Sequence, residues 1–160
     1  MQPHADTTNF SSADKATSYA QLLESLASLT AGSRFWPTNT ANTASLLWHL
    51  YHSLPSPSNH VNWAGFYVAD PSDPTRLLLG PFMGKVACQV IKVGKGVCGT
   101  AAERKKTVLV HDVEKFPGHI ACDGDSKSEI VVPIVIDEKV GFNFLARGFD
   151  LDSLVSTLLL

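Results

Sequence analysis

The sequence predicts an α+β domain with a largely antiparallel sheet. Its helical segments come mainly before its strands, and consecutive strands are joined by turns, which is typical of this class. At 160 residues the chain has the length of one domain and can bury a hydrophobic core. We therefore expect a single globular unit.

The composition is that of an ordinary globular protein, with 44% hydrophobic and 18% charged residues. The net charge of −2 argues against a surface for nucleic acid, and the short basic run at 104–106 is typical of a solvated helix end. No apolar run approaches the about 20 residues of a membrane span, and residues 1–14 do not resemble a signal peptide. Three cysteines without a secretory signal indicate a reducing compartment, so we expect a cytoplasmic protein, with the nucleus also open.

The N-terminal part of the domain is predicted to be helical. Residues 1–12 are expected to form a flexible tail, and the folded domain to span residues 13–160. From residue 13, apolar side chains recur at helical spacing and predict a first helix that ends near Gly32. Residues 40–54 predict a second helix with a wide apolar face, which Pro37 precedes.

The first predicted strand covers residues 61–69, V-N-W-A-G-F-Y-V-A. Alternation with period two puts Trp63 and Tyr67 on the same face. Turn residues follow at 70–74, and a second strand at 76–79 completes a hairpin.

Three further strands are predicted, at residues 85–93, 107–110 and 129–136. A short helix is expected after Gly94-Lys95-Gly96, between the first and second of these strands. The connection over residues 111–128 is long for a compact domain, and such loops are usually functional.

All three cysteines lie between residues 86 and 129, in three different local settings. Cys88 is expected on a strand, Cys98 at the start of a helix and Cys122 in a polar loop. A cysteine used only as a small apolar side chain belongs in an apolar run, whereas Cys122 is flanked by glycine, histidine and aspartate. The cysteines therefore predict a thiol-redox site, although for Cys88 alone an inert buried thiol is an equal alternative.

Cys98 is expected to be reactive because of its place at a helix N-terminus. The unpaired amide groups and the helix dipole there favour a thiolate. An accessible thiolate close to a second cysteine can form a sulfenic acid and then a disulfide.

Two other interpretations of this segment are weaker. Residues 94–99 match the dinucleotide pattern G-x-G-x-x-G, but the helix that follows is only about seven residues long and the preceding chain does not predict a βαβ unit. A zinc site is also disfavoured, because cysteine spacings of 10 and 24 residues without C-x-x-C do not resemble the usual ligand pairs. We therefore expect no metal.

The motifs of this chain resemble those of the free methionine-(R)-sulfoxide reductases, which are single GAF domains. The resemblance covers residues 13–135 and includes all three cysteines in type and spacing. It is carried by N-W-A-G-F-Y at 62–67, L-L-L-G-P-F at 77–82, A-C-Q-V-I at 87–91, G-K-G-V-C-G at 94–99, H-I-A-C-D at 119–123 and S-E-I-V-V-P-I at 128–134. It implies a six-stranded antiparallel sheet with helices packed on one face and a ligand pocket on the other.

The resemblance also implies a thiol-dependent reaction. Cys122 would attack the sulfur of the sulfoxide and become a sulfenic acid, with Cys98 as the second candidate for this role. Cys88 or Cys98 would then form a disulfide with it. Thioredoxin, which receives electrons from NADPH through thioredoxin reductase, would reduce this disulfide and restore the thiols. No bound cofactor is implied, and a homodimer is left open.

Five residues are implied to contact the substrate, free methionine-(R)-sulfoxide. Trp63 and Tyr67 would form an aromatic wall, and Glu129 would bind the substrate and assist protonation of the sulfoxide oxygen, which is otherwise a poor leaving group. Asp150 and Asp152 would hold the substrate ammonium. Without the resemblance, the aromatic pair also fits a packed core, and the three acids fit solvated positions.

The C-terminal part departs from the family. There, a strand rich in glycine and valine leads into the aspartate pair about five residues sooner after the glutamate, whereas residues 140–147 intervene here. The expected C-terminal helix is shortened or altered. A GAF domain that binds a small ligand without catalysis, as a sensor, is therefore the alternative function.

Overall fold

The computed structural model describes residues 9–10, 14–121 and 124–148. Most of the segment expected as an N-terminal tail lies outside these residues. Within that segment Phe10 is buried, and the carbonyl oxygen of Asn9 accepts a hydrogen bond from Nε2 of Gln21 at 3.2 Å.

The predicted α+β class and six-stranded antiparallel sheet are confirmed in the described part of the chain. The strands lie in the order β3-β2-β1-β6-β5-β4. Their bounds are Trp63–Ala69 (β1), Arg76–Gly84 (β2), Val90–Lys92 (β3), Val108–Val110 (β4), Ser128–Ile136 (β5) and Lys139–Gly148 (β6). The helices are Lys15–Thr30 (α1), Trp36–Ser53 (α2) and Gly96–Arg104 (α3), with short 3₁₀ turns at Ser58–His60 (η1) and Val113–Lys115 (η2).

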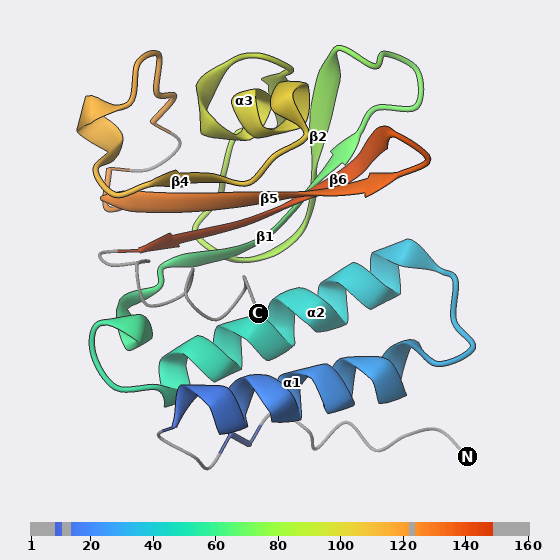
Figure 1. The fold of residues 1–160 in the computed structure, drawn as a ribbon, viewed down its shortest axis with the longest axis vertical. Coiled ribbons are helices and arrows are strands. Elements are labelled where there is room, and N and C mark those ends of the chain that lie inside the picture. Colours follow the sequence, from blue (N-terminus) through green and yellow to red (C-terminus); the bar gives the residue numbers. More distant parts are fainter. Residues whose placement is uncertain (1–8, 11–13, 122–123, 149–160) are drawn as a thin grey trace.

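The sheet separates two layers of different content (Figure 1). Helices α1 and α2 lie on one face, with α2 next to the sheet and α1 packed against α2, and an apolar core is buried there. The shorter α3 and the connection between β4 and β5 lie on the opposite face. None of the described helices is long and apolar enough to cross a membrane.

Helix α1 begins close to where the sequence predicts it, whereas α2 begins four residues earlier than predicted. The side chain of Asp14 accepts a hydrogen bond from the backbone N–H of Thr17 at 2.8 Å and caps α1. Pro37 lies within the first turn of α2, where a missing N–H leaves no helical hydrogen bond unmade. Pro37 therefore lies within this helix and does not precede it.

The third strand is much shorter than predicted, and Cys88 lies before it. Strand β3 pairs only with the first residues of β2, from Arg76 to Leu78. Pro81 follows in β2 and has no N–H to donate to a neighbouring strand. The prediction that Cys88 belongs to a strand is therefore wrong.

The residues that depart from the family pattern form the sixth strand, between β1 and β5. A two-residue turn at Asp137 and Glu138, both with positive φ, joins β5 to β6. Arg147 pairs with Trp63 of β1 on one side and with Glu129 of β5 on the other. The segment that intervenes in the sequence is thus part of the sheet.

Candidate active site

The face of the sheet that packs against α3 carries three of the predicted site residues. Trp63 and Tyr67 reach it from β1, and Glu129 reaches it from β5. Because side chains alternate along a strand, these positions share the face with Arg147 of β6, which stands opposite Trp63 and Glu129 in the register. The predicted grouping of Trp63 and Tyr67 on one face is confirmed by the ring distance of 6.2 Å between centroids.

The aromatic pair holds the loop that carries Cys88. The indole Nε1 of Trp63 donates to the carbonyl oxygen of Lys85 at 3.1 Å, and the Tyr67 hydroxyl donates to that of Cys88 at 2.8 Å. Both rings are fully buried, and burial is the main reason that the pKa of Tyr67 is raised. The outer end of the loop is tied by an ion pair between Lys85 and Asp125.

The glycine motif before α3 serves close packing. A Cβ atom at Gly99 would lie 2.2 Å from the carbonyl oxygen of Lys92, so only glycine lets the helix approach the end of β3. The amide of Gly94 donates to the carbonyl oxygen of Gly99 at 2.8 Å. Helix α3 has nine residues and follows a strand of an antiparallel sheet, which is not the context of a dinucleotide site.

Cys98 lies in the first turn of α3, as predicted, but its thiol is buried. Asn143 donates from Nδ2 to the carbonyl oxygen of Cys98 at 3.0 Å, and Sγ of Cys98 donates to Oε1 of Glu129 at 3.7 Å. Burial raises the pKa of the Cys98 thiol well above its ordinary value, and the negative charge of Glu129 adds to this shift. The expectation of a thiolate at this position is wrong here, because loss of solvent outweighs the helix dipole.

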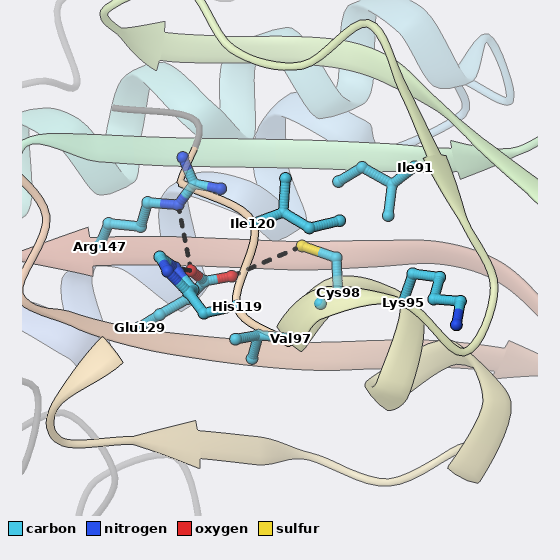
Figure 2. A pocket seen from close by; sticks show the side chains of 9 residues that line it. Ile91, Lys95, Val97, Cys98, His119, Ile120, Glu129 and Arg147 are labelled. Carbon is cyan, nitrogen blue, oxygen red and sulfur yellow. Dashed lines mark hydrogen bonds and ion pairs between the residues drawn. The ribbon is translucent and has the colours of Figure 1, made fainter. Parts of the chain in front are cut away.

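Glu129 is the centre of a buried group of polar side chains (Figure 2). Its Oε2 lies 3.4 Å from Nε of Arg147 and 3.8 Å from Nε2 of His119. Glu129 and Arg147 are only 2% and 3% exposed, so each depends on the other for compensation of its charge. The guanidinium of Arg147 also lies 5.5 Å from the ring centroid of Trp63.

A small cavity opens between these groups. Its volume is about 10 Å³, room for about one water molecule. Its lining comes from β3, from α3 and its preceding loop, from the β4–β5 connection and from β5 and β6: Ile91, Lys95, Gly96, Val97, Cys98, His119, Ile120, Glu129 and Arg147.

The remaining predicted residues are placed as follows. Cys88 is in a disulfide, and Cys98 is free. Cys122, Asp150 and Asp152 lie outside the described residues. Among the residues that are described, no three histidine, cysteine or acidic side chains form a group that could hold a metal ion.

Two residues at the pocket were not predicted from the sequence. His119 belongs to the H-I-A-C-D motif, so its place beside a cysteine was a signal available in the sequence. Arg147 carried no such signal, because its contact with Glu129 follows from the pairing of β5 with β6.

The comparisons with solved structures agree with this fold. No family model matches the chain. A solved structure described as that of the GAF domain superposes with a TM-score of 0.86 at 45% identity and covers 98% of this chain and 91% of that one. The fold is therefore that of a GAF domain, here with a thiol and a carboxylate in one buried pocket.

Two further relatives define the family. The free methionine-R-sulfoxide reductase of Saccharomyces cerevisiae is 54% identical over 136 residues, 84% of this chain and 74% of that protein. The X-ray structure of the free methionine-R-sulfoxide reductase of Neisseria meningitidis in complex with its substrate has a TM-score of 0.80 at 38% identity and covers 94% of this chain and 89% of that one. The chain belongs to the free methionine-R-sulfoxide reductase family and is an oxidoreductase.

Proposed function

We propose that the protein reduces free L-methionine-(R)-sulfoxide to methionine through its cysteine thiols. A cysteine sulfenic acid forms first, an intramolecular disulfide replaces it with release of water, and thioredoxin reduces the disulfide. NADPH supplies the electrons through thioredoxin reductase, and no cofactor is bound. The family relationship supports the substrate, because relatives carry this activity in their names and one was solved with its substrate.

The observation that carries this proposal is the convergence of three kinds of group on one face of the sheet. The buried thiol of Cys98 and the carboxylate of Glu129 are 3.7 Å apart, and the aromatic pair lies on the same face. A carboxylate orients polar groups of the substrate, and aromatic rings suit its thioether end. The hydroxyl of Tyr67 also holds the carbonyl oxygen of Cys88, a cysteine in a disulfide, so a redox-active cysteine lies beside these groups. Apart from Asn143 and Arg147, the other buried strand positions on this face are apolar, so the polar cluster is local.

Cys122 is proposed as the attacking thiol and Cys88 as the resolving thiol. The disulfide of Cys88 supports its resolving role over that of Cys98, which is free and buried. The raised pKa of Cys98 likewise makes it a weak nucleophile in this closed state, so it becomes the second candidate for both roles.

The substrate contacts proposed for Trp63, Tyr67 and Glu129 require the pocket to open. A cavity of about 10 Å³ cannot hold an amino acid, and both aromatic side chains are covered. Asp150 and Asp152 are proposed to bind the substrate ammonium. The cytoplasm is the proposed location, with the nucleus and a homodimer left open.

A coupled assay tests the proposal. Oxidation of NADPH is followed with thioredoxin, thioredoxin reductase and either isomer of free methionine sulfoxide. We expect turnover with the R isomer only. Cys122→Ser should lose all activity. Cys88→Ser should lose thioredoxin-dependent turnover but still form one methionine per enzyme molecule. Binding of the R isomer by thermal shift without any methionine formed would instead establish the sensor alternative.

A further inference from the structure

The geometry points to His119 as the catalytic residue that delivers a proton to the sulfoxide oxygen, with Glu129 and Arg147 as its positioning residues. This inference rests on the proposed function and adds a residue that the sequence prediction did not include. It replaces Glu129, which the resemblance implied would assist this protonation, as the proton donor. It depends on which groups of the pocket can give up a proton.

The reaction consumes one proton. The thiolate of the attacking cysteine bonds to the sulfoxide sulfur, the sulfur–oxygen bond of the substrate breaks, and the oxygen ends as the hydroxyl of a cysteine sulfenic acid. Thiolate, sulfoxide and one proton thus give sulfenic acid and thioether, with the cysteine sulfur oxidised and the substrate sulfur reduced by two electrons. The proton must reach the oxygen as this bond breaks, which is the task of a general acid.

The two cations of the pocket are unsuited to this task. A guanidinium does not release its proton in proteins, so Arg147 can only contribute charge. Lys95 is exposed, and its side chain extends away from Glu129 in Figure 2.

Glu129 and Cys98 are also unsuited. Glu129 is 2% exposed, accepts a hydrogen bond from the Cys98 thiol at Oε1, and forms an ion pair with Arg147, whose Nε lies 3.4 Å from Oε2. A carboxylate in an ion pair has no proton to donate. The Cys98 thiol is buried at 2% exposure and already donates to Glu129, and its raised pKa makes it a poor acid.

His119 has the position and the chemistry that the others lack. Its side chain lines the cavity and is 16% exposed, so the imidazole reaches both the pocket and solvent. It can therefore donate a proton inside and take up another from water. Nε2 lies 3.8 Å from Oε2 of Glu129, which would compensate the charge of the protonated ring.

The backbone around His119 holds the ring in this place. Gly118 has a φ of +73°, and the amide of His119 donates to the carbonyl oxygen of Phe116 at 3.1 Å, which closes a turn. The next residue, Ile120, lies 3.3 Å from the Cβ position of Gly96 at the start of α3. The turn thus brings His119 over the same helix end as Cys98.

Single-turnover kinetics of His119→Gln test the inference. Glutamine keeps a polar side chain of similar reach but has no proton to transfer. With fully reduced enzyme and free methionine-(R)-sulfoxide, we expect the rate of methionine formation to fall about 100-fold or more. The affinity for the sulfoxide, measured by tryptophan fluorescence, should change by less than about threefold, because the binding groups are untouched.

Two companion variants make the result decisive. His111→Gln changes an exposed histidine of the same connection and should leave the rate unchanged. In His119→Ala, added imidazole should restore part of the lost rate, since a free imidazole can occupy the space and donate the proton. Folding of each variant is checked by circular dichroism.

The outcomes separate this inference from the function on which it rests. If the wild-type protein forms no methionine, the proposed function fails. If the wild type is active and folded His119→Gln is equally fast, or loses affinity as much as rate, the inference about His119 is overturned. A slow His119→Ala variant that imidazole does not accelerate would also overturn it.

Discussion

The sheet can be compared face by face, because the same strands contribute to both layers. On β1, Ala64 and Phe66 pack into the core under α1 and α2, whereas Trp63 and Tyr67 face α3. On β6, Phe144 packs under α1 and α2 like its β1 partner, Phe66, whose ring centroid is 5.6 Å away.

The two faces differ in buried polar groups. The α3 face holds Glu129, Asn143 and Arg147, each at most 3% exposed, together with the polar atoms of Trp63 and Tyr67. On the opposite face the buried strand positions are apolar except for Ser128, whose hydroxyl donates to the carbonyl oxygen of Gly148. Burial of apolar side chains stabilises a fold but provides no reactive group. Buried charges add little net stability, so a buried ion pair indicates a functional role for the α3 face. Four variants or conditions test this division, from the largest expected effect to the smallest.

Arg147→Met should destabilise the protein most. It leaves Glu129, 2% exposed, without the guanidinium 3.4 Å away, so the free energy of unfolding should fall by about 3–5 kcal/mol. Urea denaturation followed by circular dichroism measures this. The double variant Arg147→Met with Glu129→Gln should recover most of the loss. Equal instability of both variants would show that packing of the arginine, and not charge, is responsible.

Leu50→Ala tests the other face. Leu50 is fully buried under the sheet, and its truncation should cost about 2–4 kcal/mol by creating a cavity. The rate of methionine formation per folded molecule should stay unchanged below the unfolding temperature, because no polar group of the pocket is touched. A tenfold loss of rate in the folded variant would contradict the separation of the two faces.

The pH dependence of stability should report the buried thiol of Cys98. Its pKa is raised above the ordinary value of 9.0, so above pH 9 the unfolded chain releases a proton that the folded chain keeps. The contribution is therefore complete below pH 9 and is lost as pH rises, with a slope of about 1.4 kcal/mol per pH unit. Urea denaturation between pH 8 and 10 should show a smaller decline in the free energy of unfolding for Cys98→Ala than for the wild type. Parallel declines in the two proteins would show that folding does not raise the pKa of the Cys98 thiol.

Tyr67→Phe should have the smallest effect, confined to the loop that carries Cys88. Loss of the hydrogen bond to the Cys88 carbonyl oxygen, 2.8 Å long, should cost about 1 kcal/mol. Hydrogen exchange measured by mass spectrometry should accelerate in residues 85–89, while peptides from α2 in the same experiment serve as the internal reference. Unchanged exchange in that loop would mean that the bond to Trp63 alone holds it.

Much of this architecture follows from local patterns in the chain. Helical spacing located α1, and alternation placed Trp63 and Tyr67 together, because both patterns depend only on the geometry of a single element. The errors arose where pairing with a neighbouring strand decides the bounds of an element. Cys88 falls outside β3 because that strand pairs with only the start of β2. The sixth strand was implied by the family resemblance but was not located in the sequence, because its residues interrupt the family motif.

The site was predictable in its residue types and not in its electrostatics. Cys98 was expected as a thiolate from its place at a helix terminus, but the helix packs that thiol against Glu129 and away from water. Arg147 lies in the site because the register of β6 against β5 places it opposite Glu129. His119 was part of a recognised motif, yet its role emerges only beside the carboxylate.

The sequence by itself determined the class of fold, the helix that carries Cys98 and the family, since these depend on residue types and short spacings. Only the tertiary structure decided which charges meet and which are cut off from solvent, because strand pairing and burial bring together residues that no local pattern connects. The contact of Arg147 with Glu129 and the burial that raises the pKa of the Cys98 thiol are both of this second kind.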